Sequence, residues 1–165
     1  MKILPLNQGH LEQALALFAE CFFHDPYYAG AYSCEAAMRG DFRECFSWML
    51  DNGDSRGAFE GERLAGMAMT FPLDRLDGHM KKELFGTEGP LLDMVEEDPS
   101  RTYLFALCVE ERSRRRGIAS ALFDSVLAPG VRYVGDVTSP VSLRMCEERG
   151  FRTRAVDGIW TRAER

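Results

Sequence analysis

The residues LFALCV (104–109), EERS (110–113) and RRRGIAS (114–120) follow one another directly, and the rest of the chain is interpreted from them. The first six form a compact apolar run bounded by polar residues, which predicts a short buried strand. Beyond them, Ile118 and Leu122 are four residues apart and begin the apolar face of a helix. The stretch therefore predicts a strand, a tight polar turn and the start of a helix.

The turn between these two elements suits a bound anion. It carries four arginines and Gly117, and a helix that begins there leaves backbone N–H groups without intrahelical partners. Those groups and the helix dipole attract phosphate, and glycine lets a ligand approach the backbone closely. The patterns G-x-x-x-x-G-K-[ST] and G-x-G-x-x-G are absent, which excludes a nucleotide P-loop and a dinucleotide fold. A solvated basic turn is the alternative to a phosphate site.

The composition is that of an ordinary globular protein. The chain has 165 residues, 45% hydrophobic and 28% charged, which is enough for one domain with a substantial core. No apolar run approaches the roughly 20 residues that span a bilayer. The first residues lack the apolar stretch of a signal peptide, so we expect a cytoplasmic protein.

The charged residues are unevenly distributed along a chain whose net charge is −6. Residues 1–100 hold 8 Lys and Arg against 18 Asp and Glu, whereas residues 101–165 hold 12 against 8. This division favours an anionic ligand for the basic part and a cationic substrate, such as an amine, for the acidic part. Charges that only solvate surface helices are the alternative.

The five cysteines are odd in number and scattered, at Cys21, Cys34, Cys45, Cys108 and Cys146. No C-x-x-C spacing occurs and the three histidines stand apart. We therefore expect buried free thiols and no metal site.

Strand-type and helix-type patterns alternate through the chain. We expect strands near residues 2–6, 57–60, 64–71, 104–109, 131–137, 151–156 and 159–162, and helices from the N-cap Asn7 to before Pro26 and near 34–50, 74–85, 91–97, 118–126 and 141–149. The last two strands flank Asp157-Gly158, a strong hairpin signal. This order predicts a single α/β domain, residues 1–165, with a central mixed sheet of about seven strands flanked by helices on both faces.

Arg114-x-x-Gly117-x-Ala119, placed after a strand that ends Leu107-x-Val109, resembles the acetyl-CoA motif of the GNAT superfamily of acetyltransferases. The segment from Ser139 to Phe151 resembles that family's second CoA segment, with Ser139 in its asparagine position and Cys146 in its tyrosine position. The order of elements is similar to the whole GNAT fold. The resemblance implies that acetyl-CoA is the co-substrate, held by the strand end, the turn and the helix start. The residues implied to bind it are Leu107, Cys108, Val109, Arg114, Arg115, Arg116, Gly117, Ile118, Ala119, Ser120 and Ser139.

The chemistry implied is acyl transfer from a thioester to an amine, which needs a polarised carbonyl, a base and a proton donor for the thiolate. The resemblance assigns the polarising N–H to the end of a split strand, at Val109. Glu110 and Asp136 are the nearest candidates for the base, with a surface or ion-paired carboxylate as the alternative for each. Cys146 is the acid by position, although a small buried hydrophobe is its other interpretation. Tyr103, Tyr133 or solvent are further sources of the proton.

The resemblance thus implies an acetyl-CoA-dependent N-acetyltransferase acting on a small molecule or on a peptide or protein amine. A non-catalytic acyl-CoA-binding or regulatory module on the same fold is the alternative, because the family's tyrosine and strand glutamate are missing. Nucleic-acid binding rests only on the arginine cluster and is disfavoured by the net charge of −6. We expect no membrane or nucleic-acid partner, and a homodimer is left open.

Overall fold

The computed structural model describes residues 1–157 and 160–165, and the predicted turn residue Gly158 lies outside this part of the chain. In this described part of the chain, seven strands form one sheet in the order β1-β2-β3-β4-β5-β7-β6. Their bounds are β1 (Lys2–Pro5), β2 (Arg56–Glu60), β3 (Arg63–Pro72), β4 (Thr102–Val109), β5 (Tyr133–Val137), β6 (Arg152–Asp157) and β7 (Trp160–Glu164). Within the described residues only β4 and β5 pair in parallel, and the predicted mixed sheet is confirmed.

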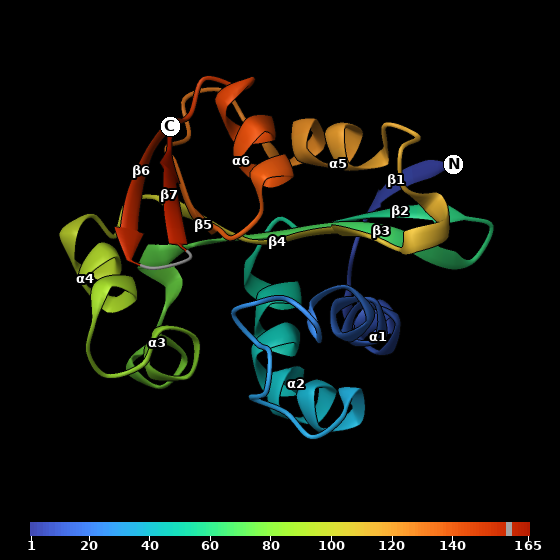
Figure 1. Ribbon diagram of the computed structural model, residues 1–165, viewed down its shortest axis with the longest axis horizontal. Helices are drawn as coiled ribbons and strands as arrows, with labels where there is room; N and C mark the ends of the chain where they lie inside the picture. The colour runs from blue at the N-terminus through green and yellow to red at the C-terminus, as the bar shows by residue number, and fades with distance from the viewer. Residues whose placement is uncertain (158–159) are drawn as a thin grey trace.

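Helices cover both faces of this sheet (Figure 1). They are α1 (Leu11–Phe22), α2 (Glu35–Asn52), α3 (Gly78–Phe85), α4 (Pro90–Glu97), α5 (Ile118–Val126) and α6 (Pro140–Glu147). In Figure 1, α1 and α2 lie below the sheet, α5 and α6 lie above it, and α3 and α4 lie beside the end formed by β6 and β7. None of the helices in the described residues is long and apolar enough to cross a membrane.

Each face of the sheet has its own apolar core. Below the sheet, Phe18 and Phe46 of α1 and α2 are buried against Met67 and Met69 of β3. Above it, the buried residues are those of the α5 apolar face, including Leu122, with α6 and β7 beside them. The spacing of Ile118 and Leu122, which predicted a helix after the arginines, is therefore the spacing of the residues by which α5 contacts the core.

The helix starts also follow from the local sequence, but the first helix begins later than predicted. Asn7 caps a short 3₁₀ turn, Gln8–His10, and α1 begins only after it. The Asn7 side chain accepts a hydrogen bond from the Gly9 N–H, because the tighter turn presents that donor first. Ser139 caps α6 by accepting from the Ser142 N–H.

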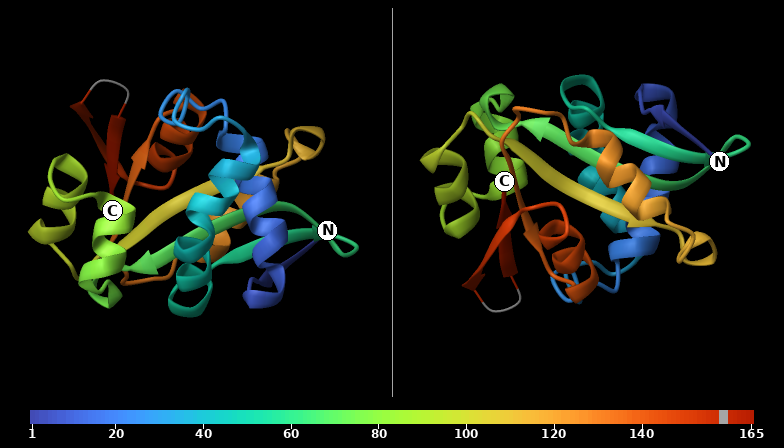
Figure 2. Two further views of the ribbon diagram at one scale, coloured as in Figure 1. Left: turned by 90° about the horizontal axis from the view of Figure 1, so that it is seen from below. Right: turned by 90° about the horizontal axis from the view of Figure 1, so that it is seen from above.

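The ladder between β4 and β5 is much shorter than β4 itself. It joins residues 102–104 to residues 133–135 and ends at the pair Leu104 and Gly135. On its other side, β4 pairs with β3 along its whole length, with a shift in register between Met69 and Thr70 that leaves Phe105 as the extra residue. Beyond Leu104 the two parallel strands part, and Figure 2 shows the yellow β4 and the orange β5 diverging. The edge of β4 from Phe105 to Val109 is therefore open toward β5.

We predict that Gly135→Ala destabilises the protein, because a β-carbon there would lie 3.1 Å from Cβ of Leu104 at the last rung of the ladder. Overpacking of this kind costs about 1–3 kcal/mol in the free energy of unfolding. Urea denaturation of wild type and variant measures it. Gly40→Ala is the matched control, because it lies inside α2 with no atom within 4 Å and should stabilise by about 0.5–1 kcal/mol. Equal effects of the two substitutions would contradict the proposed crowding.

Candidate active site

The turn after β4 has an unusual backbone. It contains a 3₁₀ turn, Glu111–Ser113, and leads to α5, which begins at Ile118. Arg115 has φ of 59° and is the only non-glycine residue with positive φ in the described part of the chain, and Gly117 has φ of 76°. Left-handed residues of this kind direct successive backbone N–H groups toward one point, which is the geometry of anion-binding loops. Space around Gly117 is open, since a β-carbon there would meet no atom within 4 Å.

Three of the four arginines in this turn are held by local partners. Arg112 lies 3.2 Å from Glu110, Arg116 lies 2.6 Å from Glu60, and the Arg114 Nε donates to the Val109 carbonyl at 3.0 Å. Arg115 has no hydrogen-bond or ion-pair partner among the described residues. Its exposed guanidinium is therefore the one in this turn most available to an anionic ligand.

Glu110, a predicted base, is tied into this turn. Its side chain is buried and accepts from the Ser113 hydroxyl at 2.6 Å, and it pairs with Arg63 and Arg112. It lines neither of the cavities described below. The arrangement braces the turn against the β2–β3 hairpin.

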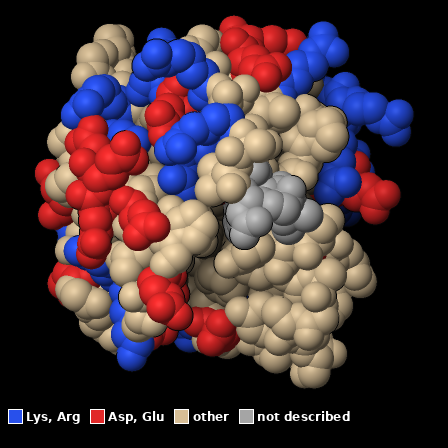
Figure 3. All heavy atoms as spheres, turned by 60° about the vertical axis from the view of Figure 1, so that its left-hand side comes forward, with Lys and Arg blue, Asp and Glu red and all other residues tan. Residues whose placement is uncertain are grey.

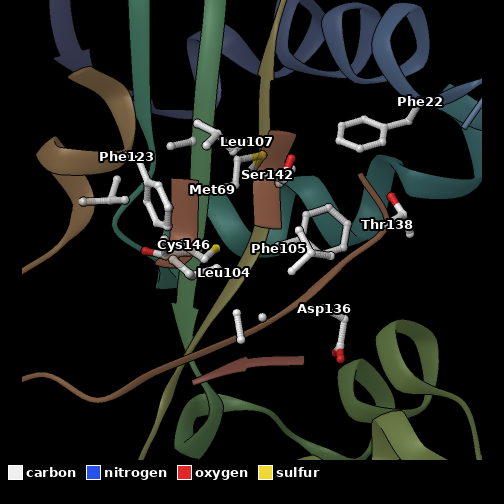
Figure 4. Close-up of a pocket in the computed structure, with 17 residues that line it drawn as sticks. Phe22, Met69, Leu104, Phe105, Leu107, Phe123, Asp136, Thr138, Ser142 and Cys146 are labelled. Atoms are coloured by element: carbon white, nitrogen blue, oxygen red, sulfur yellow. The ribbon is translucent and has the colours of Figure 1, made fainter. Parts of the chain in front are cut away.

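A cavity of about 100 Å³ lies where β4 and β5 part. Leu104 and Leu107 of β4 and Cys146 of α6 line it, together with Phe123 of α5. In the close-up, Cys146 lies beside Leu104 and Phe123, while Asp136 lies at the other end of the cavity (Figure 4). Burial raises the pKa of the Cys146 thiol to about 11, so the group is protonated at neutral pH.

Asp136, the other predicted base, lies at the end of β5 in a buried ion pair. The Arg162 Nε donates to its carboxylate at 3.0 Å, and the Tyr103 hydroxyl donates to the second oxygen at 3.2 Å. The side chains of Asp136 and Arg162 are 0% and 3% exposed. Burial raises the pKa of the Asp136 carboxyl, and the Arg162 guanidinium opposes that rise. Burial also raises the pKa of Tyr103 well above its ordinary value.

A second cavity, of about 430 Å³, adjoins the first and shares Asp136, Phe22, Phe105 and Thr138 with it. It lies between the α1–α2 connection, α2, α3 and the end of β5. Asp136 thus stands at the junction of the two cavities. The rings that line the second cavity include Tyr27 and Tyr28.

The remaining predicted cofactor residues take several places. Cys108 is buried on the opposite face of β4, against α1, and Ile118 is buried in the α5 core. Ala119 is half-buried, and the Ser120 hydroxyl accepts from Arg149 at 2.8 Å. The side chains of Cys108, Ile118 and Ser120 are therefore largely engaged in contacts within the protein.

Val109 is the last residue of β4, but β4 parts from β5 earlier along the strand. The split follows Leu104, and Val109 lies at the far end of the open edge, beside the arginines. The reason is that the ladder to β5 ends where the bulge at Phe105 turns β4 away, a contact between distant segments that the sequence of β4 does not reveal.

Sequence reasoning missed Arg162 and Thr138. Arg162 is buried on β7 and reaches Asp136 across the β5–β7 pair, and Thr138 donates to Asp25 at 3.0 Å. Neither residue stands in a motif. For Arg162, the only indication in the sequence was an arginine at an inward-facing position of the last strand.

An open strand edge, a basic turn at a helix start and two joined cavities thus lie around the place where β4 and β5 part. The sequence profile of the Acetyltransferase (GNAT) family matches residues 11–151, and the chain belongs to this family. No curated protein matches the sequence.

Solved structures share the whole fold. The histone acetyltransferase HPA2 and related acetyltransferase of Corynebacterium glutamicum ATCC 13032 is 19% identical with a TM-score of 0.69, over 99% of this chain and 93% of that one. The PaiA N-acetyltransferase of Thermoplasma acidophilum, solved with coenzyme A, is 16% identical with a TM-score of 0.64, over 100% and 99%. The polyamine N-acetyltransferase of Drosophila melanogaster is 16% identical with a TM-score of 0.69, over 99% and 97%. At these identities the likeness is one of fold.

We predict that Asp136→Asn lowers the free energy of unfolding by about 3–5 kcal/mol, because it leaves the Arg162 charge buried without a counter-ion. Chemical denaturation provides the measurement. Glu148→Gln is the matched control, since it breaks the exposed Arg144–Glu148 pair on α6 and should cost no more than about 0.5 kcal/mol. A loss at Asp136 as small as that at Glu148 would show that the buried pair does not hold the fold.

Proposed function

We propose that this chain transfers an acetyl group from acetyl-CoA to the amino group of a small molecule or peptide. The observation that carries the proposal is the open edge of β4, which runs directly into the arginine turn in a chain of the GNAT family. Support also comes from the coenzyme A complex of the Thermoplasma relative and from the amine acceptor named for the Drosophila relative.

In this proposal the two ends of the open edge have different tasks. The backbone groups of residues 105–109 hold the extended arm of the co-substrate, in the way that an added strand pairs with a sheet edge. The N–H groups of residues 115–120 and the exposed Arg115 guanidinium hold its pyrophosphate. Acetyl-CoA supplies the thioester, which lies in the smaller cavity near Cys146.

In this proposal the N–H that polarises the thioester carbonyl belongs to residues 105–107, which directly follow the last β4–β5 pair, and not to Val109. Asp136 stands at the junction of the cavities, where a proton must leave the attacking amine, and Tyr103, which lines the larger cavity, donates a hydrogen bond to Asp136. Cys146 remains protonated at neutral pH and is positioned to hydrogen-bond the departing sulfur. Glu110 serves in this scheme as the brace of the turn, because it is paired within the turn and lines neither cavity.

We predict that Gly117→Glu abolishes measurable acetyl-CoA binding, because it places bulk and negative charge against the pyrophosphate. Titration calorimetry measures the affinity, and circular dichroism checks the fold. Gly130→Glu is the control, because Gly130 has the same φ of 76° and equally open surroundings but follows the far end of α5. The Gly130→Glu variant carries the same backbone strain and the same added charge as Gly117→Glu, and should bind acetyl-CoA as the wild type does. Unchanged affinity in Gly117→Glu would overturn the assignment of the turn.

A non-catalytic acyl-CoA-binding module is the second candidate, because a buried thiol, Cys146, occupies the position of the family's tyrosine. Thiol release from acetyl-CoA in the presence of amines separates the two. We expect sustained release that depends on both protein and amine. Binding of acetyl-CoA without release above background would favour the module.

A further inference from the structure

The larger cavity has walls of aromatic rings. Phe22, Tyr28 and Phe42 come together there in edge-on contacts, with Tyr27 and Tyr32 from the α1–α2 connection beside them. Burial raises the pKa of both Tyr28 and Tyr32, which keeps the phenols neutral. Such walls bind alkyl chains by apolar contact and cations through their ring faces.

The charged groups that line this cavity are all acidic. They are Asp25, Asp41, Glu83 and Asp136, and no lysine or arginine of the described residues lines it. The space-filling view shows a hollow with acidic side chains along its lower border (Figure 3). The cavity therefore favours a positively charged occupant over a neutral or anionic one.

The four carboxylates differ in how far their negative charge is already balanced by partners within the protein. Asp136, at the inner end, is paired with Arg162. Asp25 accepts from Thr138 and from the Tyr27 N–H, which places it beside the same strand end.

Asp41 and Glu83 come from α2 and α3 and lie around Cys45, away from the strand end. Asp41 accepts one hydrogen bond, at 2.6 Å from the Tyr32 hydroxyl. Glu83 has no hydrogen-bond or ion-pair partner in the described part of the chain. Negative charge without a counter-ion is thus concentrated at the α2–α3 end of the cavity.

The reaction limits which group of the acceptor amine the carboxylates of Asp41 and Glu83 can bind. The attacking nitrogen must be neutral, because its lone pair forms the new bond. A monoamine therefore brings no lasting charge for the carboxylates of α2 and α3. Their natural counterpart is a second cationic group on the acceptor, some distance from the reacting nitrogen.

We propose that the acceptor is an aliphatic amine with a second positive charge, such as an α,ω-diamine, whose far ammonium lies between Asp41 and Glu83. This rests on the proposed function. One nitrogen attacks the thioester carbon, the N–C bond forms and the C–S bond breaks. The proton of the attacking amine leaves, and coenzyme A departs as its thiol after taking up one proton. The far ammonium keeps its charge throughout and positions the chain along the aromatic wall.

The test compares 1,5-diaminopentane with 5-amino-1-pentanol, which has the same length but no second charge. With acetyl-CoA and wild-type protein, we expect kcat/KM for the diamine to exceed that for the amino alcohol by at least about 30-fold, mostly through KM. In the double variant Asp41→Asn, Glu83→Gln, the advantage should fall to about threefold or less, with the amino alcohol unchanged. Asp51→Asn removes a carboxylate of the same helix that does not line the cavity and should keep the full advantage.

Calorimetric titration of the same two amines into the protein saturated with coenzyme A tests the cavity without turnover. Tighter binding of the diamine that disappears in the double variant supports the proposal even if neither amine is acetylated, in which case only the proposed function fails. Equal kcat/KM and equal affinity for the two amines would overturn the diamine proposal and leave acetyl transfer standing. An equal loss for both amines in the double variant would also overturn it.

Discussion

The rest of the structure depends on the early end of the hydrogen-bond ladder between β4 and β5. The strands meet only from Thr102 to Leu104, and Gly135 allows them to approach closely at the last rung. The bulge at Phe105 then turns β4 away while its pairing with β3 continues to Val109. This parting opens one backbone edge inside the sheet, creates the smaller cavity and directs β4 toward the arginine turn. A continuous parallel ladder would have paired this edge with β5 and closed the cavity.

The parting must be stabilised by contacts elsewhere, because it forgoes hydrogen bonds at the centre of the sheet. Two separate cores, one on each face, hold β4 against β3 and against the helices. At the end of β5, the buried Asp136–Arg162 pair joins β5 to β7 beside the opening. Its position at the junction of both cavities means that the same contact supports the sheet and borders the proposed reaction site.

The arginine turn and the larger cavity separate positive from negative charge in space, as the two parts of the sequence do. The basic turn belongs to the second part of the chain, and the carboxylates of the larger cavity come mostly from the first. The uneven charge thus has a spatial counterpart, although many of these residues are ion-paired on the surface, as at Arg43 with Glu12 and Arg144 with Glu148. Only the few charges that line a cavity bear on substrate choice.

The sequence by itself determined the elements and the turn, because periodicity, caps and glycine positions are local properties. The face of α5, the β2–β3 hairpin and the turn at Gly117 were all predicted from residues near one another. Only the tertiary structure decided where β4 parts from β5, that Glu110 is enclosed by Arg63 and Ser113, and that Arg162 meets Asp136. Apart from the neighbouring Ser113, these facts depend on contacts between segments 26 to 47 residues apart. Strand pairing and burial create such contacts, and no local pattern in the sequence encodes them.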